Sequence, residues 1–241
     1  MQRKKVGWSS WGKTHVGMQR KVNQDALLDL AEQGLWVVAD GMGGHHRGDL
    51  ASSKIIEALQ SFKAEKRAGF AVQKIYQQLD KVNAELIECA AQLGQNVVIG
   101  STIALLYADK KHCIIVWSGD SRIYLFRRGT LKQLSLDHNN EQSFLDQGFS
   151  AEDLVNHPYA QALAHAVGGE TSVYLDMQIQ EVREGDIFLL CSDGLNKELS
   201  DCDIESVLQG LPYRQAVDEM MDLALQRGGR DNITILAAKV I

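Results

Sequence analysis

The strongest constraint on this fold is the stretch Leu35–Gly44, LWVVADGMGG, in which an apolar run leads directly into Asp40. The run predicts a buried strand, and the glycines at 41, 43 and 44 predict a sharp turn with a close approach of the backbone to whatever the Asp40 carboxylate binds. An Asp-Gly pair after an apolar run is also typical of a hairpin, so this stretch alone fits two structures. Other parts of the sequence are needed to distinguish a strand that ends at a site from a hairpin.

Three further aspartates stand beside glycine at the ends of apolar runs. IFLLC (187–191) leads to Asp193, CIIVWS (113–118) leads to Asp120, and Asp231 stands just before ITILAA. Each one alone is ordinarily a turn residue or a solvated carboxylate. If their strands share a pair of packed sheets, the four carboxylates could meet at one rim, where they repel one another unless they are protonated or bound to cations. Oxygen ligands of this kind suit Mg²⁺ or Mn²⁺.

Length and composition predict one domain that spans residues 1–241. The chain is 45% hydrophobic with only two prolines, and no Pro-rich or Ser/Gly-rich stretch resembles a linker. The longest apolar runs, such as IALLYA (103–108), fall far short of the roughly 20 residues that a membrane span requires. We therefore expect no membrane partner.

Charge and cysteine content indicate a cytoplasmic protein that does not bind nucleic acid. The net charge is −6, and because residues 1–21 carry six basic and no acidic residues, the remaining chain carries −12. Residues 7–13 are not the apolar core of a signal peptide. The cysteines show no CxxC pair and no zinc spacing, so we expect reduced and mostly buried thiols at positions 89, 113, 191 and 202.

Hydrophobic periodicity predicts an α+β fold in which helices cover antiparallel sheets. Steps of three and four predict helices from 49 to 59 and over 71–93, 201–209 and 213–226. Turns of two to four residues link most of the expected strands, so neighbouring strands must be antiparallel. These strands are expected at 6–18, 26–30, 35–40, 101–108, 112–118, 121–127, 131–134, 174–182, 186–191 and 232–240.

Residues 136–172 differ from the rest of the chain. The segment is polar, carries three of the seven histidines and shows only short helical patches, at 139–147, 151–156 and 159–166. We interpret it as an irregular excursion over the surface, similar to a flap.

Six motifs together resemble the metal-dependent protein phosphatases of the 2C type, and the bacterial Ser/Thr form most closely. They occur in the order of that family over nearly the whole chain: RKVNQD (20–25), VVADGMGGH (37–45), GST (100–102), SGDSR (118–122), CSDGL (191–195) and GGRDNIT (228–234). The resemblance implies a central β-sandwich of two antiparallel sheets, flanked by pairs of helices in α-β-β-α layers, with a two-metal site at one end.

The resemblance also implies which residues bind the two Mn²⁺ or Mg²⁺ ions. Asp40 bridges the ions, the backbone carbonyl of Gly41 binds the first, and Asp193 and Asp231 bind the second. Asp120, together with Asp193, holds a weaker third ion. Two cations of this kind lower the pKa of a bridging water, so that the resulting hydroxide can attack the phosphorus directly.

Three more residues receive roles by the same resemblance. Arg20 would bind the substrate phosphate, for which a guanidinium offers a bidentate fork. Asp25 would act through a metal ligand or a metal-bound water, and Asn232 would orient such a water. Met42 stands where eukaryotic members often carry a histidine as a proposed general acid, and His45 and His46 nearby are not assigned that role. The proton donor to the leaving group therefore stays unassigned.

We predict a Ser/Thr phosphoprotein phosphatase, monomeric and cytoplasmic, that reverses the signal of a Ser/Thr kinase. Two alternatives stay open: a metal phosphohydrolase acting on small phosphoesters or nucleotides, and an inactive phosphatase fold that only binds partners. The second would lose a metal ligand or the phosphate-binding arginine, and this chain retains them all. Some bacterial phosphatases of this size serve type VI secretion, a pathway that the sequence itself does not specify.

Overall fold

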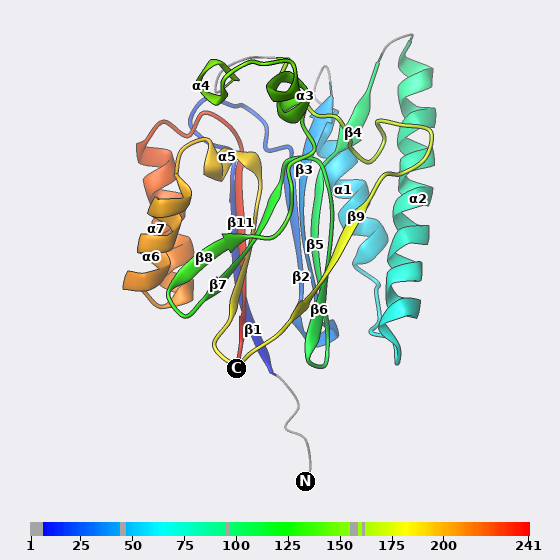
Figure 1. Ribbon diagram of the computed structural model, residues 1–241. Coiled ribbons are helices and arrows are strands. Elements are labelled where there is room, and N and C mark those ends of the chain that lie inside the picture. The colour runs from blue at the N-terminus through cyan, green and yellow to red at the C-terminus, as the bar shows by residue number, and fades with distance from the viewer. Residues whose placement is uncertain (1–6, 44–46, 95–96, 155–158, 161) are drawn as a thin grey trace.

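Two antiparallel sheets form the centre of the protein. In the computed structural model, which describes residues 7–43, 47–94, 97–154, 159–160 and 162–241, the sheets lie face to face (Figure 1). One sheet has the order β1 (Trp8–His15), β11 (Ile233–Val240), β10 (Ile187–Cys191), β7 (Arg122–Arg127) and β8 (Thr130–Gln133). The other has the order β2 (Asp25–Leu30), β3 (Leu35–Gly43), β5 (Ile103–Asp109), β6 (His112–Ser118) and β9 (Asp176–Glu181), while β4 (Ile99–Ser101) pairs with the end of β3.

Pairs of helices cover the outer faces of both sheets (Figure 1). On one side lie α1 (Gly48–Leu59) and α2 (Ala68–Leu93), and on the other lie α6 (Asp201–Gly210) and α7 (Tyr213–Gln226). The short elements are the 3₁₀ turn Ala31–Gln33, α3 (Glu141–Asp146), α4 (Ala151–Leu154) and α5 (Asp193–Asn196). This arrangement confirms the predicted α+β fold with a helix-flanked sandwich.

The side chains of β3 explain why its sequence is apolar throughout. Successive side chains of a strand point to opposite faces, and both faces of β3 are covered. Leu35, Val37 and Ala39 pack into the core under α1 and α2, whereas Trp36 and Val38 pack into the core between the sheets. All five are fully buried, so a polar side chain at any of them would lose its contact with water.

Strand register brings the predicted site residues to one end of the sandwich. Cys191 on β10 pairs with Arg122 on β7 and with Ile235 on β11, so Asp193, Asp120 and Asp231 follow or precede their strands at the same edge. In the other sheet Asp25 pairs with Asp40. The predicted convergence of four strand junctions therefore follows from the pairing.

Several local predictions differ from the structure. The strand through Asp40 does not end there but continues to Gly43, because Gly41 pairs with Ser101 on β4, so neither a turn nor a hairpin begins within residues 40–43. The helix expected at 159–166 is absent from the described residues of that range. Its backbone pairs with the preceding loop instead: Ala164 N–H donates to the His138 carbonyl at 2.8 Å, and Leu163 forms a bridge with Asn139.

The cysteines are all free thiols, and three of them are buried or half-buried as expected. Cys202 is exposed in the first turn of α6, so its predicted burial is wrong. Across the described residues, no helix combines the length and apolar character needed to cross a membrane.

Candidate active site

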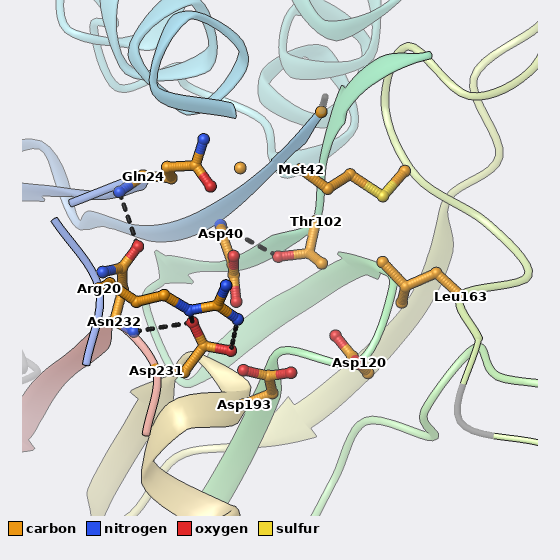
Figure 2. A pocket seen from close by; sticks show the side chains of 12 residues that line it. Arg20, Gln24, Asp40, Met42, Thr102, Asp120, Leu163, Asp193, Asp231 and Asn232 are labelled. Carbon is orange, nitrogen blue, oxygen red and sulfur yellow. Dashed lines mark hydrogen bonds and ion pairs between the residues drawn. The ribbon is translucent and has the colours of Figure 1, made fainter. Parts of the chain in front are cut away.

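A cavity of about 300 Å³ lies at the end of the sandwich where the strand junctions meet. Around it lie the carboxylates of Asp40 on β3 and of Asp120, Asp193 and Asp231 beside the ends of other strands (Figure 2). The residues that line the cavity are Arg20, Gln24, Asp40, Gly41, Met42, Gly43, Thr102, Asp120, Leu163, Asp193, Asp231 and Asn232. All the predicted site residues except Asp25 are in this set.

Asp40 is held in the cavity by the neighbouring strand. Its N–H donates to Thr102 Oγ1 at 3.1 Å, and its carbonyl accepts from the N–H of Thr102 at 2.8 Å. Thr102 Oγ1 also shares a hydrogen bond of 2.6 Å with Ser121 Oγ. Burial, followed by the charges of the surrounding aspartates, raises the pKa of Asp40 well above its usual range. A carboxylate in this position is costly without a cation nearby.

Asp25 lies directly opposite Asp40 in the β2–β3 ladder, an arrangement that places like charges side by side. Only 7% of Asp25 is exposed. Its Oδ2 accepts from Ser192 Oγ at 2.7 Å and from Thr234 Oγ1 at 2.8 Å. Burial raises the pKa of Asp25 to about 6 in spite of these two hydrogen bonds. Its position beside the cavity, behind Asp40, fits the predicted indirect role.

The pKa of Asp120, like that of Asp40, is raised by burial and by neighbouring carboxylates. Burial, and then the charges of Asp193 and Asp137, raises the pKa of Asp120 to about 7. The turn that carries it is fixed by the buried His138, whose Nδ1 accepts the Gly119 N–H at 3.2 Å. The other ring nitrogen of His138 lies 3.1 Å from Asp176 Oδ2.

Asp231 and Asp193 differ from the other carboxylates because basic side chains of the protein neutralise them. The Arg20 guanidinium binds Asp231 through two hydrogen bonds, of 2.8 and 2.9 Å. Lys197 Nζ forms an ion pair with Asp193 and lies 3.0 Å from Asp231 Oδ2. Burial alone would raise the pKa of Asp231, but Arg20 and Lys197 together lower it. For Asp193, burial outweighs Lys197 and the pKa is raised.

The sequence motifs assign no role to Lys197, although its spacing from Asp193 indicates a contact. It stands four residues after Asp193, and residues with this spacing face each other on one turn of helix. The CSDGL motif was interpreted only as a strand end. The short helix α5 that follows it, and the pairing that this helix permits, were not predicted.

The donor set suits hard divalent cations. The cavity offers oxygen ligands from four aspartates, and the buried oxygens Asp193 Oδ1 and Asp25 Oδ1 have no hydrogen-bond partner. Within the described ranges no three acidic, His or Cys side chains close around a single point. On the Asp193–Asp231 side, the two carboxylates pair with Arg20 and Lys197 instead of facing a common point. The chemistry of the residues therefore fits a metal centre in which Arg20 and Lys197 occupy part of the ligand oxygens.

Gly41 is required for close packing rather than for a turn. A Cβ at this position would lie 1.9 Å from the carbonyl oxygen of Gly48 and 2.8 Å from that of Gln24. This close contact is with the backbone of Gly48 and Gln24, so the predicted approach of the backbone to whatever Asp40 binds stays a prediction. Gly44, His45 and His46 lie outside the described residues.

Asn232 organises the loop that carries Arg20. Its Oδ1 accepts the Gln24 N–H at 2.8 Å, and its Nδ2 donates to the carbonyls of Val16 and Val22 at 2.8 and 3.0 Å (Figure 2 shows the bond to Gln24). These contacts fix both ends of the segment 16–24. Orientation of a water by Asn232 stays a prediction.

Solved structures identify the class of protein to which this fold and site belong. The chain is similar to PppA of Pseudomonas aeruginosa, described as a key regulatory component of T6SS, with a TM-score of 0.90 and 40% identity over 98% of this chain and 99% of that one. The catalytic domain of the Ser/Thr protein phosphatase PstP, in complex with two manganese ions, matches with a TM-score of 0.85 and 29% identity over 98% of this chain and 99% of that one. The fold is that of bacterial Ser/Thr phosphatases.

The family is shown by the sequence comparison as well. The family model for protein phosphatase 2C matches residues 11–236. The Ser/Thr phosphatase stp of Listeria monocytogenes is 33% identical over 236 residues, which cover 93% of this chain and 92% of the relative. The chain belongs to the protein phosphatase 2C family.

Proposed function

We propose that this protein hydrolyses phosphoserine and phosphothreonine in other proteins and that it requires two Mn²⁺ or Mg²⁺ ions, with a weaker third. The observation that carries the proposal is the cavity itself, in which four aspartates and one arginine meet at one end of a phosphatase fold. The Listeria relative and PstP, both named Ser/Thr phosphatases, support this substrate class.

The chemistry divides between the ions and the protein. When bound, the ions supply an activated water and neutralise charge on the phosphoryl oxygens. Asp40, Asp193 and Asp231, with the carbonyl of Gly41, would hold the two main ions. Asp120 would hold the third together with Asp193. The hydrogen bonds to Thr102 hold the backbone of Asp40, so the main chain that carries this ligand is positioned before a metal arrives.

Arg20 would bind the phosphate of the substrate. Its side chain is 56% exposed at the cavity rim, and its guanidinium reaches Asp231 from the loop that Asn232 holds. A planar fork that now pairs with a carboxylate can pair in the same way with two phosphoryl oxygens. Leu163 brings the segment 136–172 to the cavity, which supports a role for that segment in the choice of protein substrate.

The substrate class is tested by comparing a phosphothreonine peptide, a nucleotide and p-nitrophenyl phosphate, each with Mn²⁺ and with EDTA. The proposal predicts hydrolysis that EDTA abolishes and a kcat/KM that is highest for the peptide. A nucleotide turned over faster than the peptide would favour the small-phosphoester alternative. Metal binding without any hydrolysis would favour the inactive binding module.

We further propose that the enzyme is a cytoplasmic monomer that opposes a Ser/Thr kinase, a reading supported by its free cysteines and acidic body. Its similarity to PppA supports a regulatory role in type VI secretion. Expression in a Pseudomonas strain that lacks PppA tests this role. Restored regulation of secretion by the wild type but not by Asp40→Asn is expected, and failure of both would refute the pathway.

A further inference from the structure

Two basic side chains occupy one half of the acidic cavity. Lys197 bridges Asp193 and Asp231, and Arg20 binds both oxygens of Asp231. Asp193 and Asp231 are mostly buried, with side-chain exposures of 16% and 20%. The two carboxylates therefore have tethered cations within direct contact.

The other half of the cavity has no such cation. Among the ion pairs formed by described residues, none involves Asp25, Asp40 or Asp120. Asp25 Oδ2 accepts from two hydroxyl groups, and Asp25 lies opposite Asp40 in the ladder. The cavity is thus divided into a side neutralised by the protein, at Asp193 and Asp231, and a side that is not, at Asp40.

Lys197 is positioned by the backbone on both sides of it. Its N–H donates to the Asp193 carbonyl at 2.9 Å, and its own carbonyl accepts from Arg230 Nη2 at 2.5 Å. Glu198, the adjacent acidic residue, is bound by Arg230 at 2.9 Å. Lys197 is therefore directed to the cavity carboxylates by its place at the end of α5, while its acidic neighbour Glu198 is paired with Arg230.

We propose that Lys197 is an internal competitor for the metal ion at Asp193 and Asp231. A cation that enters this position must displace the ammonium group, whereas a cation at Asp40 displaces none. Lys197 therefore weakens the metal affinity of the Asp193–Asp231 side, and the Asp40 side fills first. This inference rests on the proposed function, because it assumes that the same carboxylates bind the catalytic ions.

The test measures Mn²⁺ binding to the full-length protein from the EPR signal of the free ion. The variants are Lys197→Met, which removes the charge, and Lys197→Arg, which keeps it. Lys13→Met is the matched control, because Lys13 pairs with Asp218 at 2.7 Å and has a similar exposure, 40% against 45% for Lys197. Circular dichroism melts in EDTA and in Mn²⁺ report folding independently of activity.

We expect Lys197→Met to bind its weaker Mn²⁺ about tenfold more tightly than the wild type, because two partly buried ion pairs no longer have to be broken. Lys197→Arg and Lys13→Met should stay within about threefold of the wild type. In EDTA the Lys197→Met protein should melt at a lower temperature than the wild type, and saturating Mn²⁺ should remove the difference.

Unchanged or weaker Mn²⁺ binding by a folded Lys197→Met protein would overturn the inference, as would an equal gain in Lys13→Met. If the wild type in the same samples hydrolyses a phosphothreonine peptide in an Mn²⁺-dependent manner, that failure concerns Lys197 alone. If the wild type neither binds Mn²⁺ nor hydrolyses the peptide, the proposed function fails and the inference fails with it.

Discussion

Replacement of Asp25 by asparagine should stabilise the metal-free protein, and increasingly so as the pH rises. Asp25 is buried opposite Asp40, and Asp25 Oδ1 has no hydrogen-bond partner. Asparagine has nearly the same shape, and its carbonyl oxygen can still accept from Ser192 and Thr234. The substitution therefore removes the buried negative charge and retains the packing.

The magnitude follows from the pKa of Asp25, which burial raises from 3.8 to about 6. A carboxyl group with a raised pKa favours folding while it is protonated, and this contribution is lost as the pH rises from the unfolded value through the folded one. The loss amounts to about 3 kcal/mol, at 1.36 kcal/mol for each pKa unit. The variant should thus match the wild type near pH 4 and exceed it by about 3 kcal/mol above pH 7.

The assay is urea unfolding in EDTA at several pH values between 4 and 8. Asp29→Asn is the matched control, because Asp29 is exposed on the same strand. It should show no gain that grows with pH. A gain for Asp25→Asn that is constant or falls with pH would refute the electrostatic account of this pair. Added Mn²⁺ should reduce the gain, because a nearby cation stabilises the ionised form of Asp25.

Two further substitutions test the packing and the phosphate contact. Gly41→Ala should lower the free energy of unfolding by about 3 kcal/mol, because its Cβ would overlap the Gly48 carbonyl. Gly69→Ala, whose Cβ would have nothing within 4 Å, should be neutral or slightly stabilising. Chemical denaturation measures both variants, and equal stabilities would contradict the close approach at Gly41. Arg20→Lys should lower kcat/KM for a phosphothreonine peptide about 10- to 100-fold, mainly through KM, because lysine lacks the bidentate fork. An unchanged KM would remove Arg20 from phosphate binding.

Much of the fold could be predicted because apolar periodicity reports directly on burial. The run at 35–39 is apolar at every position since β3 faces two cores, and the three- and four-residue steps of α2 match its buried face. The expected helix 71–93 differs from α2, Ala68–Leu93, only at its first turn. The four aspartates could be assembled because short turns force antiparallel pairing, and pairing brings alternate strand ends to one edge.

The remaining features depend on contacts that local patterns do not encode. β4 is only three residues long, and it extends β3 past Asp40 by pairing across a long sequence separation. The pairing of Asp25 with Asp40 is fixed by strand register, and the strand expected at 26–30 leaves Asp25 out. The position of Lys197 required knowledge that a single helical turn follows the CSDGL motif.

The central claim is that the aspartates around the cavity hold the ions that make the protein a phosphatase. The most direct test measures Mn²⁺ stoichiometry by equilibrium dialysis and phosphothreonine peptide hydrolysis on the same samples of wild type and Asp40→Asn. We predict two bound ions in the wild type, one held more tightly than the other, loss of at least one in Asp40→Asn, and a fall in kcat of at least about 10³-fold. An Asp40→Asn protein that keeps both the ions and the activity would contradict the account.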